Sequence, residues 1–76
     1  MIIVLVGTQS WKLITNHAFS IRNSNNQVQA KEDIKYYSAI VTIINSNMEA
    51  GNSIKFNTEV LFCKNSIIKA EDIIYL

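Results

Sequence analysis

Short runs of alternating apolar and polar residues, rich in β-branched side chains, recur along the whole chain, and no long helical pattern interrupts them. Alternation with a period of two residues is typical of a strand with one buried face. The most regular runs are residues 18–23, 27–30 and 54–62. The pattern predicts an all-β fold, a small barrel or rolled antiparallel sheet of five to seven short strands.

The clearest local signal is the polar segment 23–26, which separates two alternating runs. A two-residue turn at Ser24-Asn25 would pair Ile21 with Val28 and place polar residues opposite polar residues on the other face. Asparagine also tolerates the positive φ that tight hairpin turns need. Residues 18–30 are therefore predicted to form a β-hairpin.

The remaining segments give a less regular pattern. Residues 34–45 favour a strand, although their apolar residues also recur at helical spacing, so a helix is the alternative. Residues 45–52 hold Asn, Ser and Gly and are predicted to be a loop. Residues 66–76 indicate a strand, a tight corner and a last short strand. No internal repeat or linker is evident, so residues 1–76 are predicted to form a single β domain.

Residues 54–62 are predicted to be one long bent strand, or two strands that meet near 57–58. Alternate residues of this run are apolar or Thr and are expected on one face: Ile54, Phe56, Thr58, Val60 and Phe62.

The small size of the chain, 76 residues, makes its core marginal, so a stabilising partner is expected. Cys63 is the only cysteine and His17 the only histidine, which argues against an internal disulfide and against a structural zinc site. Association with further copies is the remaining means of stabilisation. The apolar first and last strands supply the candidate oligomer edge, formed by Ile3, Leu5, Ile74 and Leu76.

The charges give no electrostatic drive toward nucleic acid or an anionic membrane, because seven basic residues are offset by six acidic ones. Neighbouring carboxylates on a strand point to opposite faces, so the two Glu-Asp pairs do not indicate a catalytic pair. We expect no catalytic residues, metal or cofactor. A candidate binding surface is formed by aromatic, basic and polar residues: Trp11, Lys12, Arg22, Asn25 and Tyr36.

These observations predict a non-enzymatic binding or assembly protein that acts through its sheet surface as a homo-oligomer. A barrel that binds single-stranded nucleic acid through its aromatic and basic residues is one alternative. Thirteen Ile and nine Asn suggest an A/T-rich genome, such as that of a phage or mobile element, and an inhibitor protein is a second alternative. The apolar run 2–6 is too short for a signal segment or membrane span, so a cytoplasmic location is expected.

About half of the chain also resembles GroES-type co-chaperonins. In that family a glycine-led strand is followed by a Thr-Glu-Val segment and then by two hydrophobic strands around an acidic corner. The matching residues here are Gly51-Asn52-Ser53-Ile54-Lys55-Phe56, Thr58-Glu59-Val60 and Ile67-Ile68-Lys69-Ala70-Glu71-Asp72-Ile73-Ile74. In addition, Ser38-Ala39-Ile40-Val41-Thr42-Ile43-Ile44 lies where the family has the strand before its glycine-bearing loop. The resemblance implies a small barrel, assembly into a ring and a chaperonin as partner.

Overall fold

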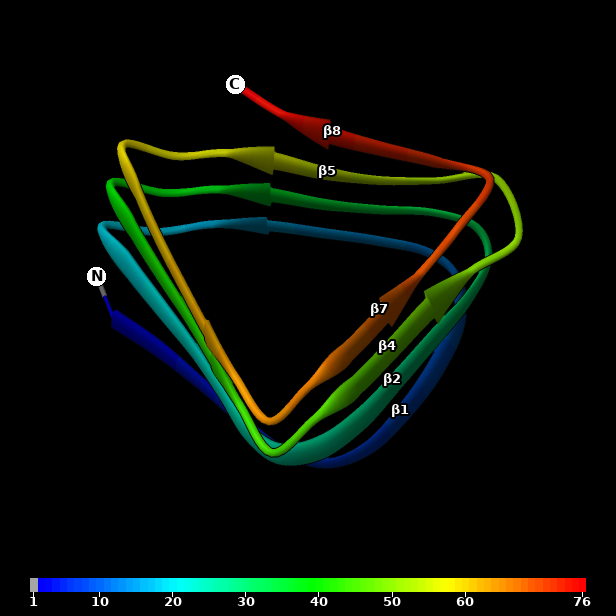
Figure 1. Ribbon diagram of the computed structural model, residues 1–76, viewed down its shortest axis with the longest axis horizontal. Coiled ribbons are helices and arrows are strands. Elements are labelled where there is room, and N and C mark those ends of the chain that lie inside the picture. Colours follow the sequence, from blue (N-terminus) through cyan, green and yellow to red (C-terminus); the bar gives the residue numbers. More distant parts are fainter. Residues whose placement is uncertain (1) are drawn as a thin grey trace.

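The computed structural model describes the backbone of residues 2–76 and the side chains of residues 12–76, and these residues form a β-solenoid of about three turns. Figure 1 looks down the solenoid and shows a triangular outline, in which the chain passes along three flat faces before each return. Every strand pair is parallel, because each turn runs in the same direction as the one before it. The fold is thus all-β, but it is neither a barrel nor an antiparallel sheet.

Two long strands and six short ones make up the solenoid. They are β1 (Ile2–His17), β2 (Ser20–Tyr37), β3 (Ile40–Ile44), β4 (Asn47–Ala50), β5 (Ser53–Asn57), β6 (Val60–Lys64), β7 (Ile67–Lys69) and β8 (Asp72–Tyr75). β1 and β2 each bend around two corners and so contribute to all three faces.

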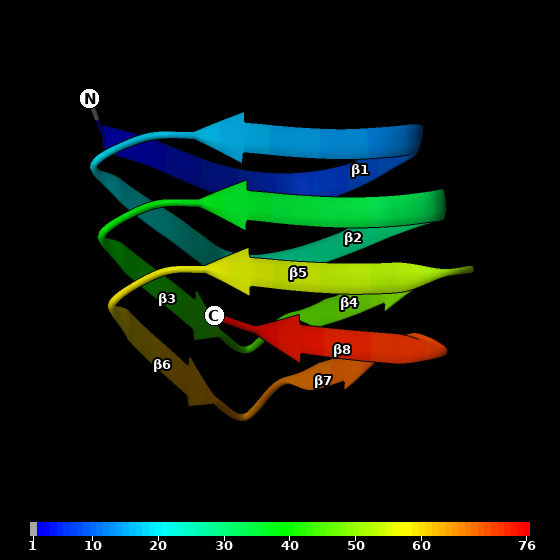
Figure 2. The same cartoon turned by 90° about the horizontal axis from the view of Figure 1, so that it is seen from above.

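Each face is a stack of four parallel segments. In face 1, β3 lies between the start of β2 and β6, and in face 2, β4 lies between the middle of β2 and β7. In face 3, β5 lies between the end of β2 and β8. The corresponding parts of β1 complete the stacks. Each of the four stacked levels is called a rung here. β1 is the first rung, and β6, β7 and β8 form the last rung, at the opposite end (Figure 2).

A period of 20 residues in the sequence underlies this stacking. Residues one turn apart share a position, as in the columns Ile14-Ile34-Ile54 and Val28-Met48. The most regular column is at the first corner, between faces 1 and 2, where Asn25, Asn45 and Asn65 all have φ of 50°. Asparagine is one of the few residues that adopt this left-handed conformation readily, so it can end one face and begin the next in each of the last three rungs.

Serine side chains join successive rungs at the first corner. The hydroxyl of Ser46 accepts a hydrogen bond from the backbone amide of Asn26 at 3.2 Å and donates one to the carbonyl of Ile44 at 2.8 Å. Ser66 repeats this in the next rung, where it accepts from the amide of Ser46 and donates to the carbonyl of Lys64. The polar corner residues thereby satisfy backbone groups that a buried bend would otherwise leave without partners.

The other two corners use different means. At the second corner, between faces 2 and 3, the amide of Gly51 donates to the carbonyl of Ala30, and no space remains for a side chain against Lys31. At the third corner, between faces 3 and 1, the hydroxyl of Ser38 donates to the carbonyls of Phe19 and Ile40.

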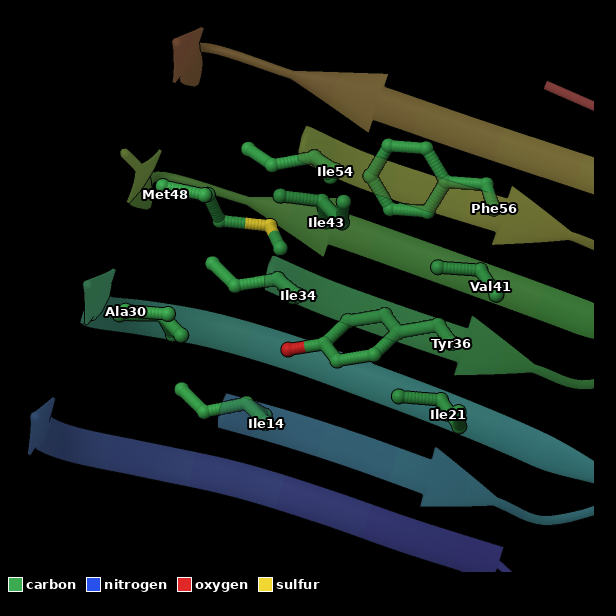
Figure 3. Close-up of a cluster of buried hydrophobic side chains, with 12 residues drawn as sticks. Ile14, Ile21, Ala30, Ile34, Tyr36, Val41, Ile43, Met48, Ile54 and Phe56 are labelled. Carbon is green, nitrogen blue, oxygen red and sulfur yellow. The ribbon is translucent and has the colours of Figure 1, made fainter. Parts of the chain in front are cut away.

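Alternate residues of every face point into the triangle and form one continuous core (Figure 3). Tyr36 and Phe56 lie in successive rungs and contact each other edge to face, with their ring centres 6.0 Å apart and their planes inclined by 73°. Because each rung covers the inward side chains of its neighbour, the middle rungs are the best buried. The fully buried apolar residues include Ile21, Val28, Ile34, Val41, Ile43 and Ile54, all with 0% exposure.

Several sequence-based expectations are wrong for one shared reason, which is that each strand pairs with the next turn and not with its neighbour in sequence. Residues 23–26 form a corner and not a hairpin turn, so Ile21 lies against Val41 and Val28 against Met48. The positive φ expected at Asn25 is present. Residues 45–52 contain β4 and are not simply a loop.

The run 54–62 consists of two strands, β5 and β6, which meet near Thr58 as one of the two alternatives predicted. The corner reverses the alternation, however. Ile54 and Phe56 point inward, whereas Val60 and Phe62 point outward with 52% and 51% exposure. Residues 34–45 are not a helix, and they form two strands and not one: the end of β2 and all of β3, separated by the third corner at Ser38-Ala39.

Candidate functional site

The residues of the predicted binding surface do not come together in the fold. Arg22 lies on the outer side of face 1, Asn25 lies at the first corner, and both are exposed. Lys12 is exposed near the second corner, and Tyr36 is in the core with 0% exposure. The side chain of Trp11 lies outside the described residues.

The residues of the predicted oligomer edge lie at the two ends of the stack. Ile74 and Leu76 belong to the last rung and are 39% and 61% exposed. Ile3 and Leu5 belong to the first rung, and their side chains lie outside the described residues. The two apolar strands singled out in the sequence are therefore both terminal, although they do not lie side by side.

The last rung holds the inward-pointing side chains that have no rung below them. Ile73 occupies the position that Ile54 occupies one turn earlier, and its exposure is 54% where Ile54 has 0%. Tyr75 similarly has 52% exposure where Phe56 has 1%. Seven of the ten large exposed apolar residues that are described lie within residues 60–76. Ile73 and Tyr75 point inward, whereas the other five point outward: Val60, Phe62, Ile67, Ile74 and Leu76.

The backbone of the last rung is also open along one edge. Among the described residues, β6, β7 and β8 pair only with β3, β4 and β5, so each has one edge without a strand. Such an edge carries free N–H and C=O groups and readily accepts another strand. In the two rungs before it, the backbone amides at this corner, those of Asn26 and Ser46, each donate a hydrogen bond to a serine in the following rung. The amide of Ser66 occupies the same position at the open edge, where the described residues supply no such serine.

Charged residues flank this apolar end at two corners. Lys64 ends β6 at the first corner, and Glu71 and Asp72 mark the second corner. Cys63 lies just before the first corner, in β6, with its side chain on the inward side, and it is exposed because no described residues cover it. The site therefore combines an apolar centre, a free strand edge and corners of opposite charge.

His17 and Cys63 lie at opposite ends of the solenoid, on faces 3 and 1, and so do not form a catalytic pair. The His17 ring instead stacks on Tyr37, with the ring centres 4.5 Å apart and the planes inclined by 7°. Residues 12–76 contain no cluster of three or more His, Cys, Asp or Glu side chains arranged to hold a metal ion. In the described part of the chain, no helix has the length and apolar character needed to cross a membrane.

Sequence reasoning missed the inward residues of the last rung, because it treated 60–76 as part of a closed sheet. The 20-residue spacing of Asn25, Asn45 and Asn65 was the signal that would have identified them. Comparison with known protein families, curated proteins and solved structures finds no match to this chain.

Proposed function

We propose that this chain is a non-enzymatic assembly protein that associates with a further layer of β-structure through its last rung. The observation that carries the proposal is the difference between matched positions, since Ile73 and Tyr75 are half-exposed where Ile54 and Phe56 are buried. Repeat proteins generally need a capping layer over such an end. Here the described residues of the last rung include no such capping layer and present apolar side chains at this end.

Addition of a β-layer is favourable because the open end exposes both apolar side chains and backbone hydrogen-bonding groups. Burying one Ile or Leu side chain fully contributes about 1.5–3 kcal/mol, and the last rung presents several partly exposed ones. The free edges of β6, β7 and β8 add backbone hydrogen bonds whose geometry is already set. An added β-layer therefore gains both apolar burial and hydrogen bonds without reorganising the solenoid.

The solution mass of the purified chain at low and high micromolar concentration tests this function. We expect a mass above that of one chain at the higher concentration, and a mass of one chain for Ile73→Lys, which places a charge in the apolar end. Gln29→Lys adds the same charge to the outside of face 2 and is the matched control, because Gln29 is exposed and far from the last rung.

The thiol of Cys63 provides an independent measurement on the same samples. Its reaction with a maleimide is expected to slow as the wild-type concentration rises, and to stay fast in Ile73→Lys. If that variant loses its β-sheet circular dichroism, Tyr75→Ser removes apolar area without adding a charge. A wild-type chain that stays monomeric, with Cys63 equally reactive at both concentrations, would overturn the proposed function.

A further inference from the structure

We propose that the layer on the last rung is the last rung of a second copy, related to the first by a two-fold axis through Ile68. This rests on the proposed function and names its partner. A two-fold axis in the plane of the rung reverses the chain direction. β7 then lies antiparallel to itself, and β6 lies antiparallel to β8 of the second copy.

The inward and outward positions match in this arrangement. Residues that face each other across the contact are equally far from Ile68 along the chain, one before it and one after it. Cys63 therefore faces Ile73 of the second copy, and both point inward as their partners Ile43 and Ile54 do. The same rule joins Leu61 with Tyr75 on the inner side, and Phe62 with Ile74 and Val60 with Leu76 on the outer side.

This matching depends on the residue spacing of this chain, and a triangular cross-section alone would not produce it. The first and second corners lie at nearly equal distances from Ile68, at Asn65-Ser66 and at Ala70-Glu71. Because the corners coincide, an antiparallel partner keeps its apolar side chains over the core along all three faces. A one-residue offset would have exchanged the inner and outer side chains.

A triangular end allows three two-fold axes, one through each face, and the positions of the charged residues favour the axis through Ile68. The axis through Ile68 places the first corner on the second, so that Lys64 of one copy faces Asp72 of the other on the outer side, twice in the dimer. An axis through the middle of β6 would place Glu71 against its own copy. Like charges directly opposite each other are destabilising. An axis through β8 would place the first corner, Asn65-Ser66, on itself and leave Lys64 without an acidic residue opposite it.

The contact is small and therefore reversible. The solenoid spans 26 × 24 Å across its two longer axes, so a triangular end measures roughly 300 Å² and the contact buries on the order of 600 Å² in total, below the usual size of specific interfaces. We expect a dimer that dissociates within the micromolar range. A head-to-tail contact between the last and first rungs would instead repeat without closing and produce filaments.

A charge exchange tests the geometry. Lys64→Asp and Asp72→Lys each bring like charges together at two places, and each is expected to weaken the dimer roughly tenfold, as measured by sedimentation. The double variant restores both pairs with the charges reversed and should return to within about threefold of the wild-type dissociation constant. Both residues are exposed, so neither substitution disturbs the core.

A disulfide provides the second measurement. Oxidation of Ile73→Cys with diamide should give a covalent dimer on a denaturing gel, through Cys63 of one copy and residue 73 of the other. Tyr75→Cys, which faces Leu61 of the second copy, should give much less. A dimer whose dissociation constant is unchanged by the charge exchange, and which does not crosslink, would overturn the two-fold geometry but would not contradict the proposed function. Filaments would likewise overturn only the two-fold geometry, whereas a wild-type monomer would overturn both the geometry and the proposed function.

Discussion

The backbone amide of Ser46 donates a hydrogen bond to the hydroxyl of Ser66, 3.1 Å away and one rung further along the solenoid. The hydroxyl of Ser46 in turn accepts from the amide of Asn26. Each serine thus binds the preceding rung at the first corner. The chain of bonds reaches from the second rung to the last.

Replacing Ser46 with Ala should therefore destabilise the fold. The buried amide of Asn26 loses its acceptor, and we expect the free energy of unfolding to fall by about 1–3 kcal/mol in urea titrations. Ser66→Ala is the matched comparison and should cost less, because the hydrogen bond that it removes is only partly buried, whereas the one between Ser46 and Asn26 is buried. Equal losses in the two variants would contradict this explanation.

Gly51→Ala should be at least as damaging. A Cβ atom at position 51 would overlap the backbone carbonyl oxygen of Lys31, which cannot move without displacing the rung above. Overpacking of this kind costs about 1–3 kcal/mol, measured as a lower midpoint of thermal or urea unfolding. Glu71→Ala at the same corner of the last rung, where the side chain is exposed, should change stability by less than about 0.5 kcal/mol.

Tyr36→Phe should leave stability unchanged or raise it by about 1 kcal/mol. The Tyr36 hydroxyl is buried and has no hydrogen-bond partner among the described residues, so its removal abolishes a desolvation cost and leaves the ring in place. The opposite result, a loss of more than about 1 kcal/mol, would mean that the hydroxyl has a partner in solution.

The same residue should make the protein sensitive to alkali. Burial raises the pKa of Tyr36 far above its ordinary value of 10.0, so the native state retains this proton where the unfolded state releases it. The stabilisation is complete below about pH 10 and is lost as the pH rises toward the native pKa. The wild-type chain should lose stability above pH 10 more steeply than Tyr36→Phe, as followed by circular dichroism.

Ser53→Ala should raise the pKa of Asp33. The hydroxyl of Ser53 donates to the Asp33 carboxylate at 2.7 Å, and the side-chain amide of Asn52 donates to it at 2.9 Å. These bonds hold the pKa of Asp33 below its ordinary value of 3.8. A depressed native pKa contributes stability above the unfolded pKa, and this contribution is lost as the pH falls through the native pKa. Carbon-detected NMR titration of Asp33 measures the shift, with Ser24→Ala as the control.

The all-β class and most strand positions could be predicted from the alternation of residues such as Ile54 and Phe56, because alternation depends only on one face being buried. The pairing could not, since parallel and antiparallel strands have the same alternation. Asn25 illustrates the difficulty. Its positive φ suits a hairpin turn and a solenoid corner equally well, and only its recurrence at Asn45 and Asn65 distinguishes them.

The co-chaperonin resemblance failed to predict the fold for a related reason. Residues 51–56 and 67–74 do form a strand after a glycine and two strands around an acidic corner. In the solenoid, however, β8 pairs in parallel with β5 one turn earlier, and β7 pairs with β4, so the barrel that the resemblance implies is not formed. Chaperonin binding and single-stranded nucleic-acid binding stay predictions.

The second corner has one residue fewer in the first and last rungs than in the two rungs between them. Three residues separate Ala50 from Ile54, but only two separate Ala70 from Ile73, and Ile54 and Ile73 still face each other across the rungs. A deletion at a bend is therefore absorbed locally, whereas the same deletion inside a strand would turn its apolar side toward water. Changes in chain length within this fold are tolerated at the vertices of the triangle, or in whole turns of 20 residues, and nowhere between.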